Sequence, residues 1–331
     1  MHSTNRNTSH SITSNPNKPL VAIGSCLVGK PVRFNGQHKR KHRHVEALKE
    51  FMDLTPICPE VGIGMGVPRE PIRIVEKEGK LIATDSATQK IDVTEPLEQY
   101  AQQQLARHPD LCGYILVKDS PSCGLERVSR YNAKGNFTAN DATGIYVSSL
   151  MNHDPLLPLE EDGRLHDPNL RESFVARVYV YHQWKQMRHS ELTVNALLQF
   201  YARHKYLVTA HDVSTYKEIG PLLANAKQYP IDELADKTIT LIMSALKKPA
   251  TRRSQANVMH HIQGYLKQHI SGPERQRLRE LIEQYREGII PMITPMTMLQ
   301  HHFHHSPDEY IAEQVFMQPY PEALALRSHL A

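Results

Sequence analysis

Two kinds of apolar spacing alternate along the first 155 residues. Short unbroken apolar runs predict buried strands at 19–25, 54–57 and 111–118. Apolar residues three or four positions apart predict helices at 43–52, 94–107 and 144–151. Thr94 is the expected N-cap of the second helix. Residues 72–83 have the pattern of a hairpin that turns at Glu78-Gly79, and residues 124–140 have the composition of a polar loop. Apolar strands that alternate with helices are typical of a parallel, doubly wound sheet, so we predict a small Rossmann-like α/β domain.

The pattern changes at 155–168, where a polar segment with several prolines interrupts it. Beyond this point the helical period dominates, and no strand signal of similar quality follows. The second half is therefore expected to be all-α. We expect four segments: a disordered tail at 1–17, an α/β domain at 18–155, a linker with a connecting helix at 156–190, and an all-α domain at 191–331.

Composition narrows the class of protein. The 331-residue chain is 40% hydrophobic and has a formal net charge of +4, with its 20 histidines counted as neutral. This mild basicity suits an anionic small substrate and is too weak by itself to indicate nucleic acid. No apolar run reaches the ~20 residues of a membrane span, and the polar N-terminus lacks the apolar core of a secretory signal. We expect a cytoplasmic protein with no membrane partner, and the sequence leaves its oligomeric state open.

Three of the four cysteines share one local context. Cys26, Cys58 and Cys123 each follow an apolar, strand-like run, VAIGSC, LTPIC and YILVKDSPSC. Parallel strands gather their carboxyl ends along one edge of a sheet, so these three residues are expected to meet there. Cys112 instead begins its strand, roughly 20 Å from that edge at about 3.3 Å per residue, and is expected to be a small buried hydrophobe.

Three thiolates cannot close a four-ligand structural zinc site and leave one metal position open. Such a site suits either an iron–sulfur cluster with one iron that no protein group binds, or a catalytic zinc. The alternative is that the three are buried or incidental thiols. Glu60, two residues after Cys58, could manage protons for an attacking water, and Ser120 or Ser122 could relay a proton or hold a developing charge.

Basic residues are frequent in the loops beside the cysteines. Arginine and lysine side chains there could pair with a phosphate group, or they could form a solvated surface. These residues are Arg33, Lys39, Arg40, Arg69 and Arg73.

Four motifs resemble those of the thiouracil desulfidase (TudS) family. They are, in chain order, SCLVGKPVRFNGQHKR, ICPEVGIGMGVPRE, IDVTE and DSPSCG, and the match covers about residues 18–155. In that family three cysteines hold a [4Fe-4S] cluster whose fourth iron is open. The resemblance places these ligands on Cys26, Cys58 and Cys123. It also implies that Glu60 and Ser120 are the catalytic pair, with Ser122 as the other candidate serine.

The same resemblance implies the reaction. The open iron would act as a Lewis acid that binds the thiocarbonyl sulfur of a thiolated uracil or its nucleotide, of the 2-thiouracil and 4-thiouridine monophosphate class. Water, assisted by Glu60, would attack the ring carbon, and the sulfur would leave as hydrosulfide without a redox change in the cluster. The expected partner is a small-molecule thiolated pyrimidine.

The second half, from about residue 190, looks like the YbgA-type helical domain that is often fused to this one. Its clearest stretch is FYARHKYLVTAH at 200–211. Within it Arg203, His204, Lys205 and His211 could contact a phosphate or RNA, or they could form a solvated face.

Histidines are densest in HHFHH at 301–305. His301 and His305 are four residues apart and would share a helix face, either as a metal pair or as part of a polar helix end.

The alternative to an enzyme is a cluster- or zinc-bearing regulatory protein that binds nucleic acid through its helical half.

Overall fold

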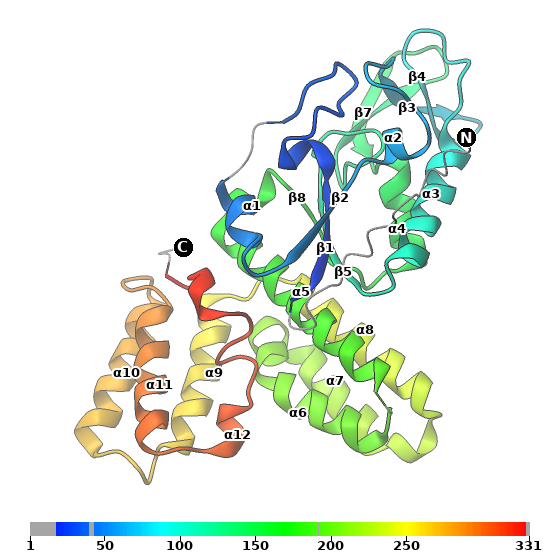
Figure 1. Cartoon of the computed structure of the whole chain (residues 1–331). Coiled ribbons are helices and arrows are strands. Elements are labelled where there is room, and N and C mark those ends of the chain that lie inside the picture. Colours follow the sequence, from blue (N-terminus) through cyan, green and yellow to red (C-terminus); the bar gives the residue numbers. More distant parts are fainter. Residues whose placement is uncertain (1–17, 40–42, 191, 329–331) are drawn as a thin grey trace, which may run out of the picture.

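The computed structural model describes residues 18–39, 43–190 and 192–328. These residues form an α/β half and a helical half, joined by the long helix α5 (Pro168–His189) (Figure 1). The predicted tail at 1–17 lies outside the described residues. None of the described helices is both long and apolar enough to cross a membrane.

Sheet A is the core of the α/β half. Its four parallel strands have the order β2-β1-β5-β8, and they are β1 (Leu20–Gly24), β2 (Asp53–Ile57), β5 (Leu111–Leu116) and β8 (Leu159–Glu161). The apolar runs predicted as strands became β1, β2 and β5, and all six residues of β5 are buried. A central parallel strand packed on both faces has this composition.

Helices cover both faces of sheet A. On one face lie α3 (Thr94–Arg107) and α4 (Ile145–His153), and the ring of Tyr146 in α4 contacts the ring of Tyr114 in β5. On the other face α5 approaches β5 at Gly113, where a Cβ atom would lie 2.7 Å from Val178. The short helix α1 (Arg43–Leu48) lies near α5, because Tyr179 of α5 donates a hydrogen bond to the carbonyl of Phe51. The predicted doubly wound arrangement is thereby confirmed.

Sheet B is smaller and mixed. It joins two antiparallel hairpins through a parallel β3–β6 contact, in the order β4-β3-β6-β7. Its strands are β3 (Ile72–Lys77), β4 (Lys80–Asp85), β6 (Val128–Asn132) and β7 (Phe137–Ala142), and the one-turn helix α2 (Pro59–Gly62) precedes them in the chain. The predicted first hairpin is confirmed, and it turns at Glu78 and Gly79, both with positive φ.

The helical half contains helices only among its described residues, as predicted. They are α6 (Val194–His211), α7 (Val213–Ala224), α8 (Ile231–Lys247), α9 (Arg252–Tyr265), α10 (Gly272–Arg286), α11 (Ile293–His305) and α12 (Glu309–Ala312). Side-chain caps fix several starts: Asp167 caps α5, and Thr251 and Ser271 form capping boxes at α9 and α10.

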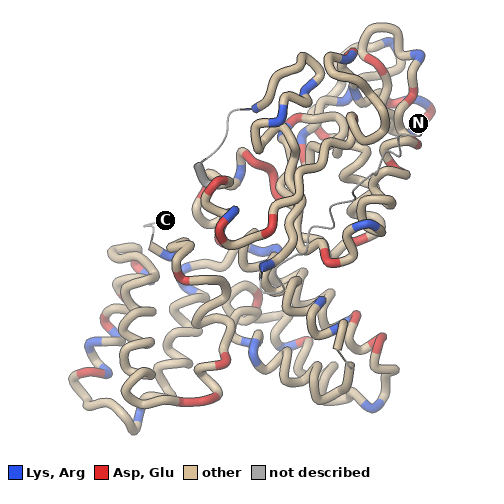
Figure 2. Tube along the Cα trace, in the orientation of Figure 1, with Lys and Arg blue, Asp and Glu red and all other residues tan. Residues whose placement is uncertain are grey.

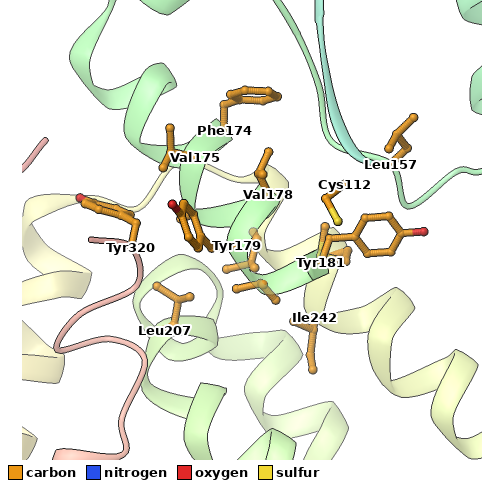
Figure 3. Close-up of a cluster of buried hydrophobic side chains, with 14 of the residues drawn as sticks. Cys112, Leu157, Phe174, Val175, Val178, Tyr179, Tyr181, Leu207, Ile242 and Tyr320 are labelled. Atoms are coloured by element: carbon orange, nitrogen blue, oxygen red, sulfur yellow. The ribbon is translucent and has the colours of Figure 1, made fainter. Parts of the chain in front are cut away.

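Helix α5 belongs to the cores of both halves (Figure 3). Phe174 and Val178 face Gly113 of β5, while other side chains of the same helix pack toward Leu207 of α6 and Ile242 of α8. Both halves therefore share one continuous hydrophobic cluster, and α5 is more than a connecting segment.

Three local expectations were wrong. Residues 124–140 are not a loop, because β6 and most of β7 lie there. The segment expected to be a linker contains β8, which pairs with β5 through Tyr114–Leu116. Val93, not Thr94, is the N-cap of α3, because the Thr94 hydroxyl accepts a hydrogen bond from the backbone of Ala83 instead. The division of the chain into domains stays a prediction.

Candidate functional site

A cavity of about 320 Å³ lies at the carboxyl ends of strands β1, β2 and β5. Cys26 follows β1, Cys58 follows β2, and Cys123 lies in the loop after β5. All three cysteines line the cavity although they are far apart in the sequence. The arrangement follows from the parallel order of the strands, which end at the same edge.

The three thiols are poorly solvated. Burial raises the pKa of Cys26, Cys58 and Cys123 above the ordinary thiol value. Lys39 opposes this effect at Cys26, and the polar Ser122 hydroxyl, 3.6 Å from Cys123 Sγ, opposes it at Cys123. The negative charges of Glu60, then of Cys58 and Cys26, raise the pKa of Cys123 further, and Cys58 also raises that of Cys26. The three sulfurs therefore lie within electrostatic range of one another. A positively charged group bound among them would favour the thiolate forms.

Glu60 and the two candidate serines form one hydrogen-bonded chain. The Ser122 hydroxyl donates to Glu60 Oε1 at 2.7 Å, and the Ser120 and Ser122 hydroxyls are 3.1 Å apart. Ser120 in turn accepts the backbone N–H of Cys123 at 3.1 Å. The Ser122 hydroxyl has one proton, and Glu60 is its nearest acceptor, since Cys123 Sγ lies 3.6 Å away. With that proton donated to Glu60, Ser120 is the donor to Ser122. Ser122 thus contacts the carboxylate directly, and Ser120 reaches it only through Ser122.

Arg69 pairs with the same carboxylate from the other side. Its Nε and Nη2 atoms lie 2.7 and 2.6 Å from Glu60 Oε2. The two side chains are 6% and 14% exposed, so the ion pair is largely removed from water. This contact holds Glu60 in one orientation and occupies two of the guanidinium nitrogens that a phosphate would otherwise use.

The remaining basic candidates occupy different positions. Lys39 lines the cavity and lies 3.6 Å from the buried Asp162, while Arg33 lines it with its guanidinium over the ring of Phe34. Arg40 lies outside the described residues. Arg73 does not line the cavity, and its guanidinium stacks over Tyr131 of sheet B.

Two further observations bear on metal binding. Within residues 18–39, 43–190 and 192–328, no three His, Cys, Asp or Glu side chains come close enough together to hold a single metal ion. Cys112 is fully buried at the far end of β5, where burial raises the pKa of its thiol to about 12. It lies apart from the cavity, and a thiol of this kind is inert.

Two buried carboxylates that were not predicted from the sequence brace the loop carrying Ser120, Ser122 and Cys123. At the end of β8, Glu161 accepts the backbone N–H of Leu125, and Asp162 accepts that of Lys118. These buried carboxylates come from the segment expected to be a linker. The only sequence signal was an unusual run of three acidic residues, Glu160 to Asp162, directly after an apolar stretch.

The candidate nucleic-acid contacts of the helical half are not a shared surface. His204 is 1% exposed, with its ring stacked on Phe200, and its Nδ1 bonds the Phe200 carbonyl. Lys205 lies over the rings of Tyr206 and Tyr310. In the view of Figure 2, basic and acidic positions are interspersed along the helices.

The histidine-rich end of α11 brings two candidate metal ligands, His301 and His305, close together. The rings of His301 and His305 have centroids 4.7 Å apart, as the four-residue spacing predicts. Among the described residues no third ligand joins them.

Comparisons with known proteins divide along the same halves. A sequence model described as 2-thiouracil desulfurase matches residues 21–162, and one described as a protein of unknown function, DUF1722, matches residues 205–321. The chain is 31% identical over 157 residues to the uncharacterized protein YbgA of Escherichia coli, covering 47% of this chain and 93% of that protein. It is 30% identical over 140 residues to the uncharacterized protein YbbK of Bacillus subtilis, covering 40% and 88%.

One solved structure, described as the [4Fe-4S]-dependent thiouracil desulfidase TudS, is 26% identical to this chain. That match covers 45% of this chain and 94% of the other, with a TM-score of 0.38. The family matches and the two relatives agree with the motifs found in the sequence. The chain therefore belongs to the 2-thiouracil desulfurase family in its α/β half and to the DUF1722, or YbgA-type, family in its helical half.

Proposed function

We propose that this protein is a desulfidase that removes sulfur from a thiolated uracil or its nucleotide, using a [4Fe-4S] cluster held by Cys26, Cys58 and Cys123. The family supports an enzyme of the thiouracil desulfidase type. The observation that carries the proposal for this chain is the cavity in which three cysteines lie beside the Glu60–Ser122 hydrogen bond. A cytoplasmic location stays an expectation from the sequence.

The donor set fits an iron–sulfur cluster. Cys26, Cys58 and Cys123 line one cavity, and soft thiolates are ligands that iron–sulfur clusters and zinc both accept. The resemblance of the cysteine motifs to those of the desulfidase family favours the cluster of these two. When bound through three cysteines, the cluster would supply one iron as a Lewis acid for the thiocarbonyl sulfur.

The residues of this chain divide the remaining work. Glu60 would take a proton from water as its oxygen bonds to the ring carbon, and Ser122 and Ser120 would return a proton to the departing sulfur. Water supplies the oxygen, and the sulfur leaves as hydrosulfide. Arg69 would hold the carboxylate in position. Arg33 and Lys39, on the cavity wall, would attract the phosphate of a nucleotide substrate.

The test is anaerobic purification with iron and sulfide analysis, followed by incubation with 2-thiouracil, 4-thiouridine monophosphate and an RNA that contains 4-thiouridine. We expect about four irons per chain and hydrosulfide release from at least one substrate. Cys58→Ala should lose the iron, whereas the matched variant Cys112→Ala should retain it. Glu60→Gln should keep the iron and lose turnover.

Two results would contradict the proposal. A colourless protein with stoichiometric zinc would exclude the cluster. Full turnover by Glu60→Gln would exclude the role of its carboxylate. Turnover of the RNA alone would keep the reaction and assign substrate recruitment to another surface, for which the helical half is the first candidate.

A further inference from the structure

Two buried tyrosines lie behind the cysteines, and the proposed reaction gives them no role. Tyr114 belongs to β5 and Tyr146 to the first turn of α4, and neither side chain has measurable exposure. Their rings meet edge to face with centroids 6.0 Å apart. Within the described part of the chain, no polar group outside this pair accepts a hydrogen bond from either hydroxyl, and their one contact is with each other.

A buried donor without an acceptor destabilises a protein, and most buried polar groups are paired. A bond between the two hydroxyls uses only one of their two protons, so one proton of this pair still lacks an acceptor.

The backbone places these hydroxyls close to the cysteines. The first turn of α4 is packed against the Cys123 loop, since Ile145 donates its N–H to the carbonyl of Pro121. A Cβ atom on Gly144 would lie 2.5 Å from the carbonyl oxygen of Ser122, which leaves no room for a side chain between them. Tyr146 follows two residues later and is therefore held beside Cys123.

The electrostatic couplings identify the same neighbours. Burial, then the negative charge of Cys123, raises the pKa of Tyr146. For Tyr114 the causes are burial, then Tyr146 and Cys123, with a smaller contribution from Cys58. Both phenols thus lie within electrostatic range of Cys123, and Tyr114 also lies within range of Cys58.

We propose that the Tyr114–Tyr146 hydroxyl pair donates a hydrogen bond to the Cys123 sulfur when Cys123 holds the cluster as a thiolate, and that it thereby stabilises the bound cluster. The inference rests on the proposed cluster. An anionic sulfur is the acceptor that this pair lacks, and hydrogen bonds to the sulfurs of a cluster favour the more reduced, more negative state. The tyrosines are positioning residues that affect the stability and the reduction potential of the cluster, whereas residues of the cavity wall contact the substrate.

The experiment compares the full chain with Tyr114→Phe, Tyr146→Phe and the double variant after anaerobic cluster assembly. Tyr310→Phe is the matched control, because the Tyr310 hydroxyl is also buried without a partner but lies in the helical half. The measurements are iron content, midpoint reduction potential, the half-life of the cluster absorbance in air, and urea unfolding of the cluster-free protein.

We expect all variants to bind iron. The double variant should have a more negative midpoint potential and lose its cluster about tenfold faster, the size of one hydrogen bond to a charged group. Without the cluster it should be as stable as the wild type or more so, because the unpartnered hydroxyls are gone. Tyr310→Phe should leave the potential and half-life unchanged.

Unchanged potential and half-life in the double variant would overturn this inference while leaving the cluster in place. Lower stability of the cluster-free double variant would also overturn it, because the hydroxyls would then have partners in the protein. Absence of iron from the wild type would instead defeat the proposed cluster, and this inference with it.

Discussion

The ion pair between Arg69 and Glu60 makes a quantitative prediction about the site. Replacing Arg69 with methionine keeps much of the side-chain volume and removes the charge. Glu60 would then keep the hydrogen bond from Ser122 but lose both guanidinium contacts to Oε2. Since only 14% of the Glu60 side chain is exposed, water cannot fully replace Arg69.

The size of the effect follows from this burial. Removing one partner of a buried pair costs about 3–5 kcal/mol, whereas exposed pairs contribute about 0–1 kcal/mol. The remaining exposure and the Ser122 contact place Arg69→Met at the lower end, about 3 kcal/mol. The double variant with Glu60→Gln removes both charges and should recover most of the loss, with a coupling free energy of about 2 kcal/mol.

Urea unfolding of the cluster-free chain measures these values without a contribution from cluster loss. Arg277→Met is the control, because Arg277 lies 3.4 Å from Glu280 with the two side chains 58% and 46% exposed. It should change the unfolding free energy by less than about 1 kcal/mol. A similarly small effect of Arg69→Met, or no recovery in the double variant, would refute the buried pair.

The same variant separates two roles for Arg69. If Arg69 orients Glu60, Arg69→Met should lower turnover of the free base and of the nucleotide by the same factor. If it binds phosphate, as the sequence suggested, only the nucleotide should show a higher KM.

Three shorter predictions follow from other contacts. Ser122→Ala should lower turnover at least about 100-fold in a hydrosulfide-release assay. Ser120→Ala should lower it less, because only Ser122 contacts Glu60. Equal losses in the two variants would contradict this difference between the serines. Gly144→Ala should lower thermal stability by about 1–3 kcal/mol, while Gly220→Ala, where nothing lies within 4 Å of the added Cβ, should raise it by about 0.5–1 kcal/mol. Burial lowers the pKa of His204 from 6.5 to about 4, so the unfolded state binds more protons between these values and stability falls as the pH falls. The loss between pH 7 and 5 is about 2 kcal/mol, and His204→Gln should remove it from the pH dependence of urea unfolding.

How far the sequence predicted the fold depended on how each element is stabilised. Strands β1, β2 and β5 are buried by apolar side chains, and such runs are visible in the sequence. Strands β6 and β7 are mostly polar, and their stability comes from backbone pairing and from Arg130 bridging Glu76 and Asp141. Partners 54 and 11 residues away are not part of any local pattern.

Strand β8 shows the same limit more sharply. Its residues Leu159–Glu161 include two buried carboxylates, a composition that argues against a strand. Arg164 and Arg177 offset the charge of Glu160, and Glu161 accepts backbone N–H groups of the Cys123 loop. Only the tertiary structure brings these groups together, so no local pattern in the sequence indicated a strand at this position.

The site itself was predictable at the level of strand ends and not at the level of single contacts. Cysteines that follow parallel strands must come to one edge, but the choice between Ser120 and Ser122 depends on a tight turn in which Asp119 has a φ of +61°. The turn directs the Ser122 hydroxyl to Glu60 and leaves Ser120 to accept the N–H of Cys123.

The charges around the cavity also decide which basic residue remains for a substrate. Arg69 is engaged by Glu60, and Lys39 faces the buried carboxylate of Asp162. Among the described residues Arg33 has no carboxylate partner, and its guanidinium lies over the ring of the exposed Phe34 at the cavity wall. A guanidinium stacked on an aromatic ring keeps its N–H groups free for an anion. Recognition of a nucleotide phosphate would therefore fall first to Arg33, whereas the reaction at the ring depends on Glu60, which Arg69 and Ser122 already hold in place.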